Sequence, residues 1–221
     1  MTININRLIR SKRRTIALIV ERDGSVTVRA PLKMSAKAIE EFVVKHADWV
    51  EKKQIEVANI APEKTKQYEA GERFLFLGQE YPLEIVKSAR KKLVLEDAFK
   101  LAESEKENAE AVFRHWYRKQ AAKIILERVA LFAERYQLAV GTIRITSART
   151  RWGSCSPKNN LSFSWRLVLT PPDVIDYVVI HELAHTVHHN HSKRFWKLVE
   201  KWMPDYKERR KQLRTYGKEI M

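Results

Sequence analysis

Residues 178–185 read Val178-Val179-Ile180-His181-Glu182-Leu183-Ala184-His185, and His191 follows six residues later. The order His-Glu-x-x-His places two histidines at positions i and i+4, which lie on one face of a helix about one turn apart. His181 and His185 can therefore direct two imidazoles at a single metal ion. Zinc accepts such nitrogens and needs at least one more protein ligand. Glu182 lies beside the first histidine, where its carboxylate can act as general base on an attacking water.

The residues around this motif are typical of a buried helix. Proline suits a first helical turn and an acidic residue complements the helix dipole, so Pro171, Pro172 and Asp173 are expected to begin the helix. Histidines that only cap or pack are the competing interpretation. Five of the seven histidines of the chain fall between residues 181 and 191, and this crowding favours a metal. Apolar side chains recur at helical spacing at Val174, Ile175, Val178, Val179, Leu183 and Val187.

The third ligand must come from chain that has turned back toward the motif. His188 and His189 are expected on the same helix, about 10–12 Å from His181 along its axis, which is too far for one ion. Asn190 tolerates the left-handed conformation that ends helices, so a turn is expected there. His191 would lie in this turn and supply the third imidazole.

The chain after the turn leaves two questions open. Ser192 is a good N-cap for a helix from Lys193 to Met203, and Glu200 on that helix is the alternative third ligand, as in zincins with a downstream glutamate. The spacing His-Glu-x-x-His-x5-His also equals that of the metzincins, but His188 stands where they carry the turn glycine. A non-glycine residue is strained at positive φ, so the metzincin class stays open.

Further segments accompany the motif, and together they resemble one known family. Over essentially its whole length the chain resembles the YgjP-like family of predicted zinc-dependent metallohydrolases, which is related to SprT-like and other zincin peptidases. The resemblance implies that His181, His185 and His191 bind the metal and that Glu182 is the catalytic carboxylate. It leaves the substrate open, because the family is labelled metallopeptidase by motif while some members are described as nucleoside triphosphate pyrophosphohydrolases. The accompanying segments are Arg151-Trp152-Gly153-Ser154-Cys155, Leu161-Ser162-Phe163-Ser164-Trp165-Arg166-Leu167, and His191-Ser192 with Phe195-Trp196.

Composition limits the class of protein. The chain has 221 residues, of which 44% are hydrophobic and 31% charged, as in a folded globular protein and unlike a disordered one. No apolar run approaches the roughly 20 residues that cross a bilayer, so no membrane partner is expected. No signal peptide is evident, and the single cysteine excludes an internal disulfide framework and fits a reducing compartment. The expected location is the cytoplasm.

The formal net charge of +15 predicts attraction to anions. Nucleic acid, nucleotides and acidic proteins would all be drawn to such a surface, although the same charge can serve solubility alone. No RNA- or DNA-binding motif accompanies it. A nucleic-acid partner is therefore compatible with the charge but not specifically indicated, and the expected substrate is a peptide or a nucleotide.

Residues 1–104 are expected to form an antiparallel, strand-rich part with one helix. The alternation of apolar and polar residues predicts hairpins of residues 15–20 with 25–29 and of residues 74–77 with 81–86, and a third pair at residues 91–95 and 98–101. Asp23-Gly24 marks the first turn. Ser35 can cap a helix from Ala36 to about Val57, and a loop is expected at residues 58–70.

Residues 105–221 are expected to form the zincin-like catalytic domain, which makes the fold class α+β. A long helix is predicted from residue 104 to 136, strands at 142–146, 149–153 and 161–169, and a solvated last helix at 205–216. In zincins an edge strand beside the active-site helix receives extended substrate, and residues 149–154 are the candidate for it. The expected substrate-binding residues are Arg149, Arg151, Trp152 and Ser154.

The predicted chemistry is hydrolysis assisted by zinc or another divalent ion. A peptidase is the first reading and a nucleoside triphosphate pyrophosphohydrolase the alternative. The third is a non-catalytic zinc-containing module that binds nucleic acid or protein, although a structural site has no need of a base such as Glu182. Cys155 near the metal and Tyr206 as oxyanion donor are secondary candidates, with packing the competing role for both.

Overall fold

The computed structural model describes residues 3–21, 23–58, 66–87 and 91–220, which form α-helices and three small sheets and so confirm the α+β class. The chain divides into two compact units, residues 1–65 and 66–221, and each is described by itself. The expected boundary between residues 104 and 105 stays a prediction about where the catalytic part begins. In the described part of the chain, no helix has the length and apolar character that crossing a bilayer requires.

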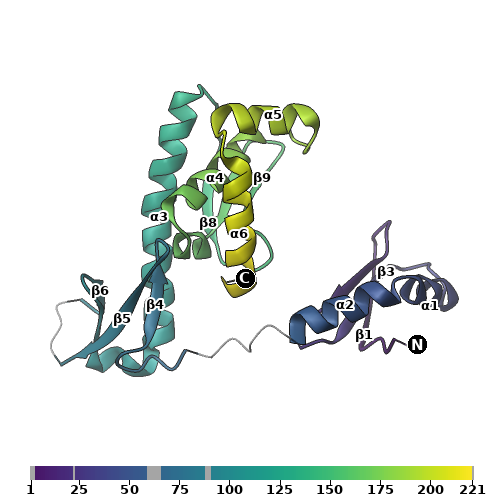
Figure 1. Ribbon diagram of the computed structural model, residues 1–221, viewed down its shortest axis with the longest axis horizontal. Coiled ribbons are helices and arrows are strands. Elements are labelled where there is room, and N and C mark those ends of the chain that lie inside the picture. Colours follow the sequence, from purple (N-terminus) through teal and green to yellow (C-terminus); the bar gives the residue numbers. More distant parts are fainter. Residues whose placement is uncertain (1–2, 22, 59–65, 88–90, 221) are drawn as a thin grey trace. The chain divides into compact units, whose positions relative to one another are not determined.

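The first unit combines a three-stranded sheet with two helices (Figure 1). Strands β1 (Arg7–Ser11), β2 (Ala17–Val20) and β3 (Val26–Pro31) lie in the order β1-β3-β2. The predicted hairpin is confirmed as the antiparallel pair β2 and β3, whereas β1 pairs with β3 in parallel. This sheet is therefore mixed and not purely antiparallel. Its small core joins Val28 and Ala30 of β3 to Ile39 and Val43.

The single helix predicted for residues 36–57 is wrong, because the chain forms α1 (Ala36–Lys45) and α2 (Ala47–Ala58). Ser35 caps α1 as expected and accepts a hydrogen bond from the Ala38 backbone N–H at 3.2 Å. The break lies at His46, whose backbone N–H bonds the Val43 carbonyl while its Nδ1 lies 2.7 Å from the Phe42 carbonyl. The imidazole thus replaces a backbone hydrogen bond and lets the helix end. The loop expected at 58–70 lies partly outside the described residues.

The second unit is built on α3 (Ala109–Arg135), which a 3₁₀ turn at Glu103–Asn108 precedes. The first half of α3 packs on a sheet of β4 (Arg73–Phe76), β5 (Gln79–Val86), β6 (Leu93–Leu95) and β7 (Phe99–Ala102), in the order β4-β5-β7-β6 (Figure 1). The predicted antiparallel pairs β4/β5 and β6/β7 are confirmed, and a parallel β5–β7 pairing joins them. Phe74 and Phe99 pack against Phe113, so this sheet shares the core of the second unit.

A second sheet of this unit has the order β8-β10-β9. Its strands are β8 (Ile143–Thr146), β9 (Gly153–Cys155) and β10 (Leu161–Ser164). The strand predicted at 149–153 is wrong in position, because residues 149–152 are irregular; Ser164 holds this connection through its hydroxyl, which donates to the Ala148 carbonyl at 2.8 Å. The run predicted at 161–169 ends as a strand at Ser164 and continues as a 3₁₀ turn, Trp165–Leu169.

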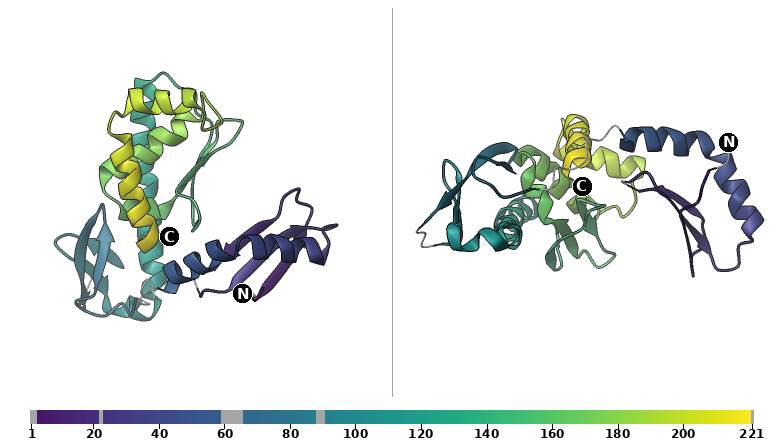
Figure 2. Two further views of the ribbon diagram at one scale, coloured as in Figure 1. Left: turned by 45° about the vertical axis from the view of Figure 1, so that its right-hand side comes forward. Right: turned by 90° about the horizontal axis from the view of Figure 1, so that it is seen from below.

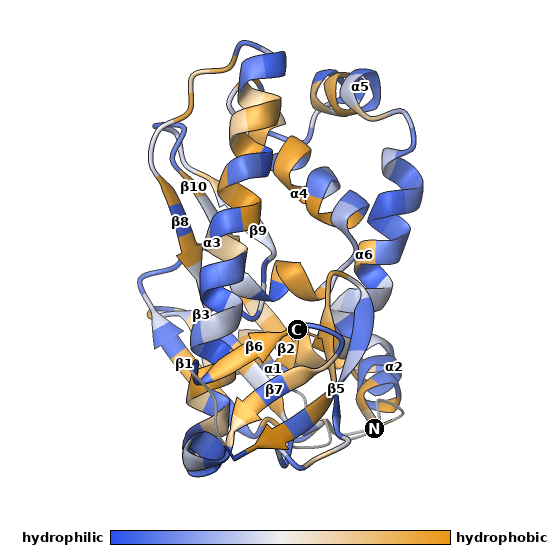
Figure 3. Ribbon diagram, turned by 90° about the vertical axis from the view of Figure 1, so that its left-hand side faces the viewer, coloured by the Kyte–Doolittle hydropathy of each residue, from blue (hydrophilic) through white to orange (hydrophobic). Residues whose placement is uncertain are grey.

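Helix α4 (Pro172–Ala184) lies at the centre of the second unit and carries the motif. It packs against α3, against β9, and against α5 (Lys193–Trp202) and α6 (Tyr206–Ile220), which follow it in the chain (Figure 2). Most of its residues are buried, in keeping with the predominantly apolar ribbon in Figure 3. A helix that is apolar on nearly all sides needs such cover, as predicted. Its few polar side chains therefore require a specific explanation.

Candidate metal centre

The motif lies where α4 ends. His181 belongs to the last turn of α4, and His185 is the C-cap residue with φ −68° and ψ −19°. The helix stops at Ala184, so the expectation that His188 and His189 continue it is wrong. The expected left-handed residue at Asn190 is also wrong, since no residue from 185 to 191 has a positive φ. The chain therefore reverses without a residue in the left-handed region, which removes the need for a glycine in this bend.

Three imidazoles converge at this end of the helix. The Nε2 atom of His191 lies 3.1 Å from Nε2 of His185 and 3.0 Å from Nε2 of His181. Among the described residues these three histidines form a group whose ligand atoms all lie within 4.8 Å of one another. Nitrogens bound to one zinc ion at about 2.0–2.1 Å in tetrahedral geometry are roughly 3.3 Å apart. The spacing therefore suits a single ion.

Neighbouring groups fix the orientation of these rings. Nδ1 of His185 lies 3.0 Å from the His188 carbonyl, to which it donates when Nε2 is left unprotonated. The ring of Phe195 stacks on His185 with a centroid distance of 4.4 Å and meets His181 edge-on at 5.0 Å. Trp196 stacks on His191 at 5.6 Å. Ser192 caps α5 as predicted, and so places Phe195 and Trp196 under the site.

The protonation of the site suits a cation. Burial, followed by the charges of His185, His191 and Arg210, lowers the pKa of His181 to about 3. Burial also lowers the pKa of His185. Neutral imidazole is the form that binds metals. His181 Nδ1 is buried without a hydrogen-bond partner among the described residues, and the Nε2 atom is the one that faces His191 and could bind an ion. The donor set therefore fits a divalent ion such as zinc.

The alternative ligand Glu200 does not join the group. Its side chain is 52% exposed, and its carboxylate lies 3.6 Å from Nζ of Lys207. The structure brings His191 to His181 and His185 instead. Cys155 does not join the group either, although it lies on the same side of β9 as Gly153, and burial and the charge of Glu182 raise the pKa of its thiol to about 11.

Glu182 is buried between α4 and the edge strand β9, with 6% of its surface exposed. A Cβ added to Gly153 would lie 2.6 Å from Oε1 of Glu182, so the carboxylate lies directly against the strand. Burial raises the pKa of Glu182 to about 8. A desolvated carboxyl with a pKa near neutrality has the affinity for protons that a general base needs.

A pocket of about 320 Å³ opens in front of His181 and Glu182. Helix α4 contributes Tyr177 and Val178 to its wall, and the chain at the start of β9 contributes Trp152 and Gly153. The opposite wall belongs to α6, so the expectation that the last helix is merely solvated is wrong. These residues of α6 recur at i, i+3, i+4 and i+7, so the sequence places them on one helix face but does not show that this face meets a pocket. They are Arg210, Leu213, Arg214 and Gly217.

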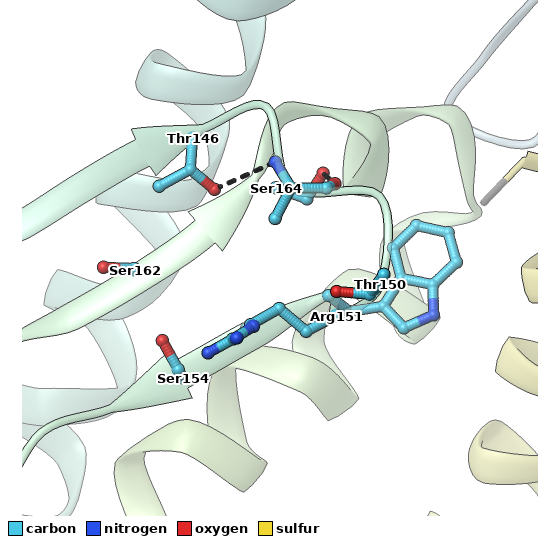
Figure 4. A pocket seen from close by; sticks show the side chains of 9 residues that line it. Thr146, Thr150, Arg151, Ser154, Ser162 and Ser164 are labelled. Carbon is cyan, nitrogen blue, oxygen red and sulfur yellow. Dashed lines mark hydrogen bonds between the residues drawn. The ribbon is translucent and has the colours of Figure 1, made fainter. Parts of the chain in front are cut away.

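The residues predicted to bind substrate are divided between two places. Trp152 lines the pocket beside Glu182 and also a second pocket of about 320 Å³, whereas Arg151 and Ser154 line only the second one (Figure 4). Side chains alternate along a strand, so Ser154 points away from Glu182 when Gly153 faces it. Arg149 is exposed and lines neither pocket. Tyr206 is buried and stacks on Trp196 at 5.5 Å, which is a packing contact.

The comparisons with known proteins give one result. A family model described as YgjP-like, metallopeptidase domain, matches residues 14–216. The match includes the whole metal centre and covers most of both compact units. No curated protein and no solved structure matches the chain significantly.

Proposed function

The chain belongs to the YgjP-like family of metallopeptidase domains, and from this membership we propose a metal-dependent hydrolase, with zinc the expected ion. His181, His185 and His191 would hold the ion, and Glu182 would serve as the general base. The observation that carries the proposal is the convergence of three Nε2 atoms next to a buried carboxylate that lines a pocket.

Bound in this donor set, zinc supplies a Lewis acid that polarises the scissile group and makes water a better nucleophile near neutral pH. Glu182 accepts the proton of the attacking water and passes it to the leaving group. The His188 carbonyl keeps His185 in the tautomer whose Nε2 can bind the ion. Gly153 lets the Glu182 carboxylate lie against the strand, which excludes water from one side of the base.

The edge position of β9 favours a peptide as substrate. Among the described residues, β9 pairs with β10 alone, so its other edge is free to pair with an extended chain. A peptide added as a further strand would pass Gly153 and so reach Glu182. Trp152 would contact it from the pocket wall. A metallopeptidase is therefore the first candidate.

A nucleoside triphosphate pyrophosphohydrolase is the second candidate, because Arg210 and Arg214 line the same pocket and would bind phosphates. A non-catalytic zinc module is less well supported. A structural zinc site closes its fourth position with a protein ligand, and no fourth histidine or cysteine of the described residues joins the group of three.

Two measurements on the purified protein test the proposal. Elemental analysis should find a divalent metal, and turnover should be found in a screen that sets peptide libraries beside nucleoside triphosphates. Release of pyrophosphate with inert peptides would decide for the second candidate. A protein that binds metal but turns over neither class would be a zinc module, and a protein that binds no divalent metal would refute the metal centre.

A further inference from the structure

We propose that Arg210 and Arg214 of α6 form an anion-binding subsite beside the metal centre, and that the substrate carries a carboxylate or phosphate next to the bond that is hydrolysed. This inference rests on the proposed function, because it names the chemistry of the group that the proposed hydrolase would recognise. It concerns residues outside the histidines and Glu182.

Both arginines face the pocket from one side. Arg210 and Arg214 are four residues apart on α6, and Leu213 and Gly217 continue the same face. Residues at i and i+4 lie next to each other on a helix, so two guanidinium groups can reach one ligand. Helix α6 packs against α4 (Figure 2). This face of α6 and the side chains of His181 and Glu182 line the same pocket.

The ring of Trp196 lies between Arg210 and the histidines of the candidate metal centre. Its Cζ lies 4.8 Å from the centroid of the Trp196 ring. The same ring lies 5.7 Å from His181 and 5.6 Å from His191, measured between centroids. A guanidinium stacked on an aromatic face keeps its N–H groups at its edge, where they can still bind an anion. Arg210 is therefore held one ring away from the ligands of the metal.

Neither arginine has an acidic partner among the described residues. The neighbouring acids are engaged elsewhere: Asp173 and Asp205 pair with Arg209, and Asp176 pairs with Arg128. Of the described residues that line the pocket, Glu182 alone is acidic. Two like charges at i and i+4 destabilise a helix unless something compensates them. An anionic ligand supplies that compensation, and a bound divalent metal would make the pocket more attractive to it.

The chemistry of the ligand follows from the guanidinium. Its planar fork binds the oxygens of carboxylates and phosphates in pairs. In a peptide this group would be an acidic side chain or a terminal carboxylate close to the scissile bond. In a nucleotide it would be a phosphate of the polyphosphate chain. Both sources present the same pair of oxygens, so they are separated by experiment.

Anion binding tests the subsite without requiring turnover. Inorganic phosphate and glutarate are titrated separately into metal-loaded protein by calorimetry. Each charge-assisted contact that is lost should weaken binding about tenfold or more, so Arg210→Gln and Arg214→Gln should each show this loss for at least one anion. Lys211→Gln removes the same charge from an exposed position of the same helix that does not line the pocket, and should change the dissociation constant less than about twofold.

The outcomes separate the subsite from general surface charge. Binding that is equal in wild type, Arg210→Gln and Arg214→Gln would overturn the proposal, as would equal weakening by Lys211→Gln or no binding of either anion to wild type. Arg214 makes no hydrogen bond, ion pair or cation–π contact with a described residue, so its variant tests the subsite even if loss of the Trp196 contact impairs folding of the Arg210 variant.

Substrate pairs then identify the source of the anion. Peptides that differ only by glutamate or glutamine beside the scissile bond are compared with nucleoside triphosphates, and the preferred anionic substrate should lose its preference in the Arg214 variant. A hydrolase that cleaves glutamate and glutamine peptides equally and ignores nucleotides would refute the subsite but keep the proposed function. Anion binding through the arginines without turnover of any substrate would keep the subsite but refute the proposed hydrolase.

Discussion

Gly153 on the edge strand β9 lies against Glu182 on α4 so closely that a Cβ at position 153 would be 2.6 Å from Oε1 and 2.7 Å from Cγ of the glutamate. Cβ atoms essentially never approach a non-bonded heavy atom more closely than 3.0 Å, so any other residue at 153 would displace the side chain of Glu182. The positions of β9 and of the Glu182 side chain therefore depend on each other, although the two segments are far apart in the sequence.

Gly153→Ala should reduce turnover strongly while leaving the metal bound. The added methyl group pushes Glu182 out of position, and overpacking of this kind costs about 1–3 kcal/mol of stability. Steady-state kinetics, metal content and thermal unfolding measure the three effects. Gly217→Ala is the matched control for stability, because its Cβ would meet only Trp152 Nε1 at 3.9 Å, and the helix should gain up to about 1 kcal/mol. Unchanged kinetics in Gly153→Ala would show that the contact does not position the base.

Glu182→Gln should keep the metal and abolish turnover. The amide has nearly the same shape as the carboxyl but cannot accept the proton of the attacking water, and loss of a general base costs roughly 10²–10⁴-fold in rate. The side chain is buried and accepts no hydrogen bond from a described residue, so no protein partner is left unpaired by the change. Metal analysis and single-turnover rates check this pair of outcomes. Wild-type rates in the variant would show that Glu182 is not the general base.

His191→Ala should lose metal affinity, whereas Glu200→Ala should not. Removing one of three converging nitrogens leaves two ligands from consecutive turns of the chain, while Glu200 already points to solvent beside Lys207. A ligand present at about 100 times its dissociation constant stabilises the folded state by about 2.7 kcal/mol. The rise in melting temperature on adding zinc to chelated protein should therefore occur in wild type and Glu200→Ala and be small in His191→Ala. The reverse pattern would make Glu200 the third ligand.

The convergence of the three histidines could be predicted because residues close in the sequence determine it. His181 and His185 follow helical spacing, and Ser192 marks the start of the next helix. The sequence therefore places His191 in the short bend between the two helices. The conformation of the bend could not be predicted, since α4 ends at Ala184 and Asn190 does not adopt the left-handed conformation. Helix ends depend on tertiary hydrogen bonds that periodicity does not reveal.

What the sequence could not supply are contacts between distant segments. A basic face such as Arg210 and Arg214 has the pattern of a solvated helix, and only the packing of α6 on α4 turns it into a pocket wall. A strand was predicted from residue 149, but the Ser164 hydroxyl bonds the Ala148 carbonyl and the first backbone hydrogen bond to β10 is made by Trp152, so the strand itself begins at Gly153. At His46 the imidazole Nδ1 takes the Phe42 carbonyl in place of a backbone N–H, and one predicted helix becomes two.

The hydrogen-bond pattern of β9 predicts which backbone groups a peptide substrate would use. Ser164 donates its backbone N–H to the Trp152 carbonyl, and the Ser156 N–H bonds the Asn160 carbonyl. In an antiparallel pair these bonds recur at every second residue, so the backbone N–H and carbonyl of Ser154 also point toward β10. The backbone groups of Gly153 and Cys155 therefore point to the free edge, next to Glu182.

A peptide that adds to this edge should depend on its own backbone amides more than on side chains. Methylation of single backbone nitrogens in a cleaved peptide should reduce kcat/KM at alternate positions only, by about tenfold where an edge hydrogen bond of about 0.5–1.5 kcal/mol and the fit of the strand are both lost. Positions between them point away from β9 and should tolerate the methyl group. A uniform effect at every position, or none, would mean that substrate does not bind as a strand along Gly153 and Cys155.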